Sequence, residues 1–163
     1  MGSAAQPVPN RALITVREAS AADGWALAAL RFALWPDEPL EVRRAEAEAN
    51  LTRTDGGLAT FVAEIEGEVI AFAEVSLRRD YVNGCETSPV AFLEGIYVRP
   101  ERRREGVGRA LVDAAEQRGR AQGCSELASD ALLDNHASHR FHSGAGFEET
   151  ERVVYFRKVL GEP

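Results

Sequence analysis

A basic, glycine-bearing segment in the middle of the chain has the residue types of an anion-binding site. It reads Val98-Arg99-Pro100-Glu101-Arg102-Arg103-Arg104-Glu105-Gly106-Val107-Gly108-Arg109. An apolar stretch precedes it and an amphipathic stretch follows, so we expect a strand, a loop and then a helix. Backbone N–H groups at a helix N-terminus attract anions, and glycines let the backbone approach a phosphate closely. The segment predicts a phosphate site; the alternative is a glycine-initiated helix with solvated arginines.

The spacing of the glycines argues against two common phosphate loops. A Walker loop would continue with Gly-Lys-Ser/Thr, whereas Gly108 is followed by Arg109. A Rossmann fingerprint would place glycine or alanine three residues after Gly108, where Leu111 stands, and no acidic ribose partner is evident. The segment therefore matches neither of these two loops, and it predicts only a local anion or a helix start with solvated arginines.

A single carboxylate interrupts the apolar run just before this loop. Glu94, followed by Gly95, lies inside the stretch 90–98, which is otherwise apolar. A carboxylate in an apolar strand is costly unless it has a partner. Glu94 therefore either pairs with a basic side chain or faces a wet cleft where chemistry takes place.

Hydrophobic periodicity predicts the elements that must position these residues. Strands are expected at 13–17, 58–65, 69–77, 90–98, 124–129 and 152–159, and helices at 20–34, 38–53, 105–122 and 135–145. The order β-α-α-β-β-β-α-β-α-β combines a hairpin with strand-helix-strand units. It predicts an α/β fold in which helices flank a mixed central sheet.

Length and charge narrow the class of protein. The chain has 163 residues and a net charge of −7. This length favours one domain, which we place at 13–163 after a flexible leader at 1–12. A negative net charge argues against nucleic-acid binding, because binding to phosphate groups depends on basic charge. The balance suits a cationic partner instead.

The remaining signals concern compartment and metals. No apolar run is long enough to span a membrane, and no secretory segment is evident. Cys85 and Cys124 lie in no metal or nucleophile motif, which suits reduced thiols in the cytoplasm, although one disulfide is conceivable. His136, His139 and His142 are three residues apart, so the outer two lie about 120° apart around a helix, and we expect no metal site.

Taken together, these features resemble the GNAT superfamily of N-acetyltransferases. Its motif Arg/Gln-x-x-Gly-x-Gly/Ala is matched by Arg103 to Gly108, and its downstream Asn…Phe pattern by Asn135, Ser138, Phe141, Gly146 and Phe147. The likeness extends in order along almost the whole chain to the aminoglycoside 6'-N-acetyltransferases. It is carried by Leu34-Trp35-Pro36, Asp80-Tyr81-Val82-Asn83-Gly84, Ser88-Pro89-Val90, Phe92-Leu93-Glu94-Gly95-Ile96, Ala128-Ser129-Asp130 and the segment 146–153.

The resemblance implies a GNAT fold with a mostly antiparallel sheet, and it implies two sets of binding residues. Acetyl-CoA would be held by Ile96, Tyr97, Val98, Arg103, Arg104, Glu105, Gly106, Val107, Gly108, Arg109 and Asn135. The aminoglycoside would be held by Trp35, Glu38, Tyr81, Glu94, Asp130 and Glu151. This second set also suits the chemistry, because a substrate with several ammonium groups calls for carboxylates and aromatic faces.

The implied reaction is direct acetyl transfer to the 6'-amino group, giving antibiotic resistance. Glu94 is the expected general base, with Asp130 as helper or alternative, and an N–H of 96–98 faces the oxyanion. His142 replaces the usual tyrosine acid; it donates a proton or, the interpretation that we favour, only packs. The resemblance also implies a homodimer. Acetylation of another small amine or a protein N-terminus, and a non-catalytic acyl-CoA-binding module, are the alternatives.

Overall fold

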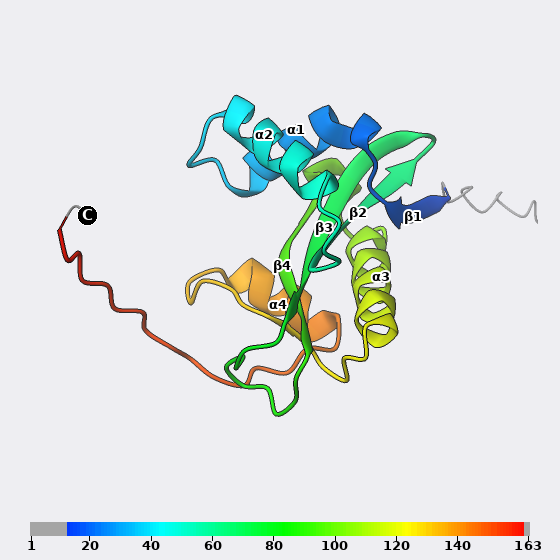
Figure 1. The fold of residues 1–163 in the computed structure, drawn as a ribbon. Helices are drawn as coiled ribbons and strands as arrows, with labels where there is room; N and C mark the ends of the chain where they lie inside the picture. The colour runs from blue at the N-terminus through cyan, green and yellow to red at the C-terminus, as the bar shows by residue number, and fades with distance from the viewer. Residues whose placement is uncertain (1–12, 162–163) are drawn as a thin grey trace, which may run out of the picture.

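The computed structural model describes residues 13–161 and has a five-stranded sheet at its centre (Figure 1). The strands, in their spatial order, are β1 (Ile14–Glu18), β2 (Leu58–Ile65), β3 (Glu68–Arg78), β4 (Val90–Val98) and β5 (Leu127–Ser129). Neighbours from β1 to β4 are antiparallel, and β5 is parallel to β4. The sheet is therefore mixed and mostly antiparallel, as predicted.

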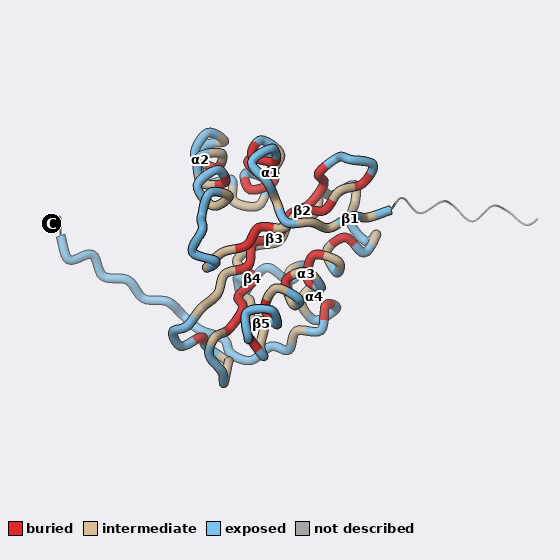
Figure 2. Tube along the Cα trace, turned by 45° about the vertical axis from the view of Figure 1, so that its right-hand side comes forward, coloured by how far each residue is buried: buried red, intermediate tan, exposed pale blue. Residues whose placement is uncertain are grey.

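Two pairs of helices cover the two faces of the sheet (Figures 1 and 2). They are α1 (Gly24–Leu34) with α2 (Leu40–Leu51) on one face and α3 (Val107–Ala121) with α4 (His136–Gly144) on the other. Short 3₁₀ turns, η1 (Ala21–Asp23) and η2 (Pro100–Arg102), precede α1 and α3. Among the described residues, no helix has the length and apolar character needed to cross a membrane.

The strands are apolar on both faces because both faces are covered. In β2, Val62 packs with Leu27 and Phe72 under α1, whereas its neighbour Ala63 packs with Leu111 of α3. Figure 2 shows the buried residues as a continuous band along the central strands. Burial on both sides explains why these strands are nearly continuous apolar runs.

A β-bulge changes the course of β4. Glu74 of β3 pairs with Gly95, but its neighbour Val75 pairs with Leu93, so Glu94 is an additional residue in the ladder. On the other side, β4 pairs with β5 only as far as Leu93 and Ser129. The second half of β4 therefore has a partner on one side only within the part of the chain that the structure describes. Bulges of this kind redirect side chains and are frequent beside active sites.

The predicted fold class and the other elements are confirmed, with ends that differ by a few residues. The predicted strand at 152–159 is wrong for this chain: residues 149–161 are exposed and have no regular structure. A strand needs the edge of another strand for its hydrogen bonds, and this tail runs away from the body of the protein (Figure 1). The predicted leader at 1–12 lies outside the described residues.

Candidate active site

Glu94 lies at the centre of the site, held by two side chains of β3. Arg78 Nη2 donates to both carboxylate oxygens, at 2.9 Å each, and Arg78 Nε lies 3.2 Å from Oε1. The Ser76 hydroxyl also donates to Oε1. Glu94 thus has the basic partner that its position required, and it is still about one-third exposed, at 31% of its side-chain surface. The first of the two sequence-based explanations, a basic partner, is confirmed, whereas a cleft at Glu94 stays a prediction.

Arg78 was not among the residues that the sequence predicted. Its guanidinium lies over Phe92, with Cζ 3.4 Å from the ring centroid, while its donors face Glu94. Ser76 and Arg78 share a face of β3 because side chains two residues apart point the same way. The antiparallel pairing of 68–78 with 90–98 is the signal that could have found this arginine, since it places Arg78 opposite Val90.

Trp35 covers the residue that follows Glu94. A Cβ added at Gly95 would come within 2.5 Å of Trp35 Cζ2 and Cη2, so the indole lies directly on the backbone there. Trp35 also meets Phe72 edge to face, with ring centroids 6.1 Å apart. The bulge thus places Glu94 and Gly95 on the same side of the sheet, with one beside Arg78 and the other beneath Trp35.

An ionic network fixes Trp35 from the helical side. The guanidinium of Arg31 lies 5.0 Å and that of Arg43 5.8 Å from the indole centroid, and Arg43 Nε donates to the Trp35 carbonyl oxygen. Arg31 pairs with buried Glu74 of β3, and both arginines donate to Glu46. Arg43, followed by Arg31, holds the pKa of the Glu46 carboxyl below its usual range. Sequence reasoning missed this network, because nothing in the helical pattern marks an arginine as buried.

The other predicted substrate residues lie in the segments after β3 and β5, in the connection between α1 and α2, and in the C-terminal tail. Asp130 follows directly after Ser129, the partner of Leu93 in the parallel ladder, so the register brings it level with Glu94. Tyr81 is 78% exposed and lies two residues before Asn83, whose amide donates to Glu151 over 3.4 Å. Glu38 is exposed in the connection between α1 and α2. Trp35 therefore lies on the residue next to Glu94, and Asp130 follows the last residue of the neighbouring strand. The hydrogen bond from Asn83 joins the segments that carry Tyr81 and Glu151.

The predicted phosphate loop has the geometry of an anion cradle. Arg104 and Gly106 both have positive φ angles, 63° and 90°, which turn the chain tightly into α3. Gly108 packs against α4 so closely that a Cβ there would come within 2.7 Å of Phe141. The first N–H groups of a helix have no partner within it and are available to an anion. Arg103 donates to the Val98 carbonyl, which ties the loop to the end of β4.

α4 supports the far side of β5. Asn135 caps this helix, with its side-chain oxygen accepting from the Ser138 N–H at 3.1 Å. The His142 ring lies between Phe141 and Phe147, with centroids 5.6 and 5.1 Å away, and its Nε2 is 2.9 Å from the Ser129 hydroxyl. In the structure His142 is packed and hydrogen-bonded to its neighbours.

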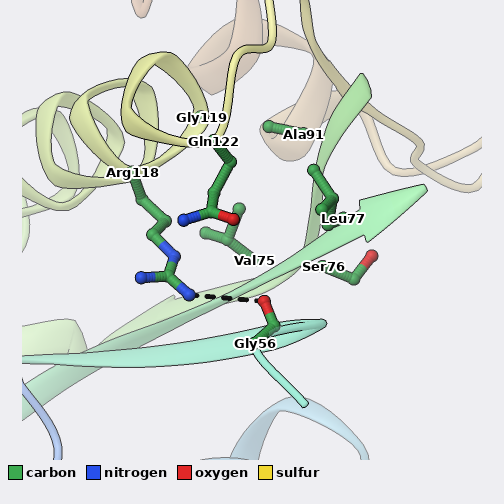
Figure 3. A pocket seen from close by; sticks show the side chains of 8 residues that line it. All are labelled: Gly56, Val75, Ser76, Leu77, Ala91, Arg118, Gly119 and Gln122. Atoms are coloured by element: carbon green, nitrogen blue, oxygen red, sulfur yellow. Dashed lines mark hydrogen bonds between the residues drawn. The ribbon is translucent and has the colours of Figure 1, made fainter. Parts of the chain in front are cut away.

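A small pocket at the opposite end of α3 contains none of the predicted site residues. Figure 3 shows its lining, which comprises Gly56, Val75, Ser76, Leu77, Ala91, Arg118, Gly119 and Gln122. Arg118 closes it by donating to the Gly56 carbonyl at 3.3 Å. The pocket has no group arranged for acyl transfer, so the candidate site remains the surface around Glu94.

Comparisons with known proteins agree with this geometry. Residues 24–147 match the acetyltransferase (GNAT) family. An aminoglycoside N(6')-acetyltransferase type 1 of Stenotrophomonas maltophilia is 51% identical over 90% of this chain and 94% of its own length. Its counterpart from Serratia marcescens is 50% identical over 85% of this chain and 93% of its own length.

Solved structures extend the likeness to three dimensions. An aminoglycoside N-acetyltransferase, AAC(6')-Iy, in complex with CoA is 41% identical, with a TM-score of 0.86 over 93% of this chain and 99% of that one. The same enzyme with the bisubstrate analogue CoA-S-monomethyl-acetylneamine gives a TM-score of 0.84 over 90% of this chain and 99% of that one. The chain therefore belongs to the GNAT acetyltransferase family and, within it, to the aminoglycoside 6'-N-acetyltransferases.

Proposed function

We propose that this protein transfers the acetyl group of acetyl-CoA to the 6'-amino group of aminoglycoside antibiotics, and so gives resistance to them. The observation that carries the proposal is the likeness to enzymes of that name along nearly the whole chain, at about half of all positions. The bulged carboxylate beside an open strand edge is the local geometry that such a reaction needs. Acetyl-CoA supplies a thioester as the acyl donor.

The residues predicted to bind acetyl-CoA have positions that support this role. Beyond Leu93, β4 has no partner on the β5 side among the described residues, so the backbone of 96–98 is open to a pantetheine arm. The cradle of 103–109 faces the same end of the strand and offers N–H groups and arginines to a pyrophosphate. In the proposal Asn135, which caps α4, contacts the arm further along.

Glu94 is the proposed general base. The substrate amine arrives mainly as an ammonium ion and must lose a proton before it can attack. Oε1 of Glu94 already accepts from Ser76 and Arg78, whereas Oε2 accepts only from Arg78 in the described part of the chain. Oε2 is therefore the atom that takes the proton, directly or through water. Asp130, one position beyond the β5 ladder, is the helper or the alternative base.

The remaining groups bind substrate or stabilise charge. A backbone N–H of 96–98 donates to the thioester carbonyl oxygen, where negative charge develops. Trp35, Glu38, Tyr81, Asp130 and Glu151 would contact the aminoglycoside. Cys85 and Cys124 are both free, and burial raises the pKa of both thiols, which disfavours a covalent acyl-enzyme. These free thiols also suit a cytoplasmic enzyme, as we propose.

We further propose that the working form is a homodimer. The tail after Glu151 presents a row of exposed apolar side chains, among them Tyr155 at 84% and Phe156 at 93% exposure. Within residues 13–161, β5 forms an edge of the sheet and has β4 as its single neighbour. A second copy of the chain supplies what each tail lacks, a strand edge and an apolar surface, in one contact.

The test is thiol release from acetyl-CoA with kanamycin as acceptor, in the wild type and in Glu94→Gln. We expect robust kanamycin-dependent release in the wild type and a fall of at least about a hundredfold in kcat for the variant, the usual size of a general-base effect. Glu116→Gln is the matched control and should keep wild-type rates, because it removes a carboxylate of similar exposure, 29%, that pairs with Arg120 on α3 away from the candidate site.

Each outcome has a definite meaning. Unchanged turnover in Glu94→Gln moves the base to Asp130 or to water and keeps the function. A wild-type enzyme that releases no thiol in the presence of any aminoglycoside contradicts the proposed function itself.

A further inference from the structure

Glu94 has a permanent counter-ion in this structure, and that changes what it can do to a cationic substrate. Arg78 contacts both carboxylate oxygens, so the pair carries no net charge toward an approaching ammonium. A free carboxylate would attract and hold the charged amine, which is the form that cannot attack. A paired carboxylate offers a hydrogen-bond acceptor without that attraction.

Arg78 is itself fixed in place. Its guanidinium lies on the face of Phe92, which is 5% exposed, and its donors are turned along the strand toward Glu94. The side chain of Arg78 is 41% exposed, so the guanidinium is partly open to solvent beside the partly exposed carboxylate of Glu94. Arg78 is also the last residue of β3, directly before the loop that carries Tyr81.

The other charged groups on this side of the sheet pair with each other or lie in the segments that follow β3 and β5. Arg31 and Glu74, from α1 and β3, pair with each other on the same side of the sheet. Asp130 follows β5, and Tyr81 lies in the loop after β3. Among the ion pairs of the described residues, Arg78 is the cation in direct contact with Glu94.

We propose that Arg78 is a positioning residue of the acetyl-transfer site, which keeps the amine beside Glu94 in its neutral, nucleophilic form. The inference rests on the proposed function. The positive charge of Arg78 cancels the attraction of Glu94 for an ammonium ion, so the amine loses its proton more readily than it would beside an unpaired carboxylate. That proton leaves through Oε2 of Glu94 and passes on to water. The nitrogen lone pair then forms the C–N bond, and the C–S electron pair leaves with the sulfur. The nitrogen finally loses its second proton, which the thiolate takes up, so that a neutral amide and a thiol are formed.

The pH profile of kcat with kanamycin tests the proposal, because kcat reports the pKa values of groups in the enzyme–substrate complex, where the bound amine titrates. A merely structural residue would lower kcat equally at every pH. In Arg78→Gln we expect the acidic limb of the profile to move up by about one pH unit. The rate should fall about tenfold at pH 7 and recover to near the wild-type value at pH 9. Arg78→Lys keeps the charge and should leave the limb within about 0.3 unit of the wild type.

Two further variants complete the design. Arg78→Met keeps an aliphatic chain on Phe92 and should show the same shift as Arg78→Gln, which separates the charge from the packing. Arg120→Gln loses an arginine from an exposed ion pair on α3 and should keep the wild-type profile. CoA binding, measured by calorimetry in each variant, reports whether the fold is intact.

An acidic limb that stays in place in both neutral variants overturns the proposal, as does a shift in Arg78→Lys as large as that in Arg78→Gln. Either result leaves the proposed function standing, because the wild type is still active. Absence of aminoglycoside turnover in the wild type is a different result and counts against the function.

Discussion

Trp35 rests on the backbone of Gly95, with two indole carbons 2.5 Å from the place where a Cβ would stand. Glycine at this position is therefore a requirement of the site, set by the indole that covers it. Because Glu94 is the adjacent residue, the contact links the aromatic surface expected to bind the sugar with the carboxylate expected to accept the proton.

Gly95→Ala should displace the indole and weaken substrate binding. The added methyl has no room, and overpacking of this kind costs about 1–3 kcal/mol. We expect KM for kanamycin to rise roughly tenfold, with the affinity for CoA unchanged, since CoA is expected to contact the other edge of β4. Steady-state kinetics with each substrate varied in turn measure both effects. A variant with the wild-type KM for kanamycin would show that Trp35 does not position the antibiotic. Gly144→Ala, at the end of α4 with nothing within 4 Å of the new methyl and no positive φ, controls for loss of a glycine.

Asp23 should make the stability of the protein depend on pH in the acidic range. Hydrogen bonds from Arg17, and then from Ser20, lower the pKa of Asp23 from 3.8 to about 2. A lowered carboxyl pKa stabilises the fold above the unfolded value and loses that contribution as the pH falls through the folded value. Asp23→Asn should therefore cost about 2 kcal/mol at pH 7, with the difference from the wild type shrinking below about pH 4 and vanishing near pH 2.

Urea unfolding at pH 7, 5 and 3.5 checks this dependence. Asp55→Asn is the control, because the pKa of Asp55 is also lowered by an arginine, Arg53, but the pair is exposed to solvent. Its removal should leave the unfolding midpoint unchanged. If Asp23→Asn costs the same at all three pH values, the carboxylate charge is not the source of the stabilisation.

The C-terminal tail should decide the oligomeric state. A chain that ends at Arg152 lacks the exposed apolar residues from Val153 to Leu160, and we expect it to be a monomer where the full chain is a dimer. Light scattering coupled to size-exclusion chromatography gives both masses. A chain that ends at Gly161 keeps those residues and should remain a dimer. A full-length monomer would contradict the homodimer itself, whereas a dimer of the shortened chain would place the interface elsewhere.

The sequence was sufficient for the elements whose patterns are local. Periodicity located the helices and the first five strands, and Glu94 was identifiable because a carboxylate stands out in an apolar strand. The partners of Glu94 were not identifiable, because Arg78 reaches it through strand pairing, which periodicity does not specify. The segment 152–159 has strand-forming residues, yet it runs away from the sheet and pairs with no strand of the described residues, so propensity without a partner gave a wrong prediction.

The bulge at Glu94 also changes whether the odd-numbered or the even-numbered residues of β4 face α3. Before it, the odd positions Ala91 and Leu93 pack toward α3; after it, the even positions Ile96 and Val98 do. The alternation of side chains along β4 therefore changes by one position at Glu94. A substitution in β4 alters one side chain, whereas loss of a single residue at the junction would exchange inside and outside for the rest of the strand. Insertions and deletions in this enzyme should therefore be absent from β4 and occur in the loops around it.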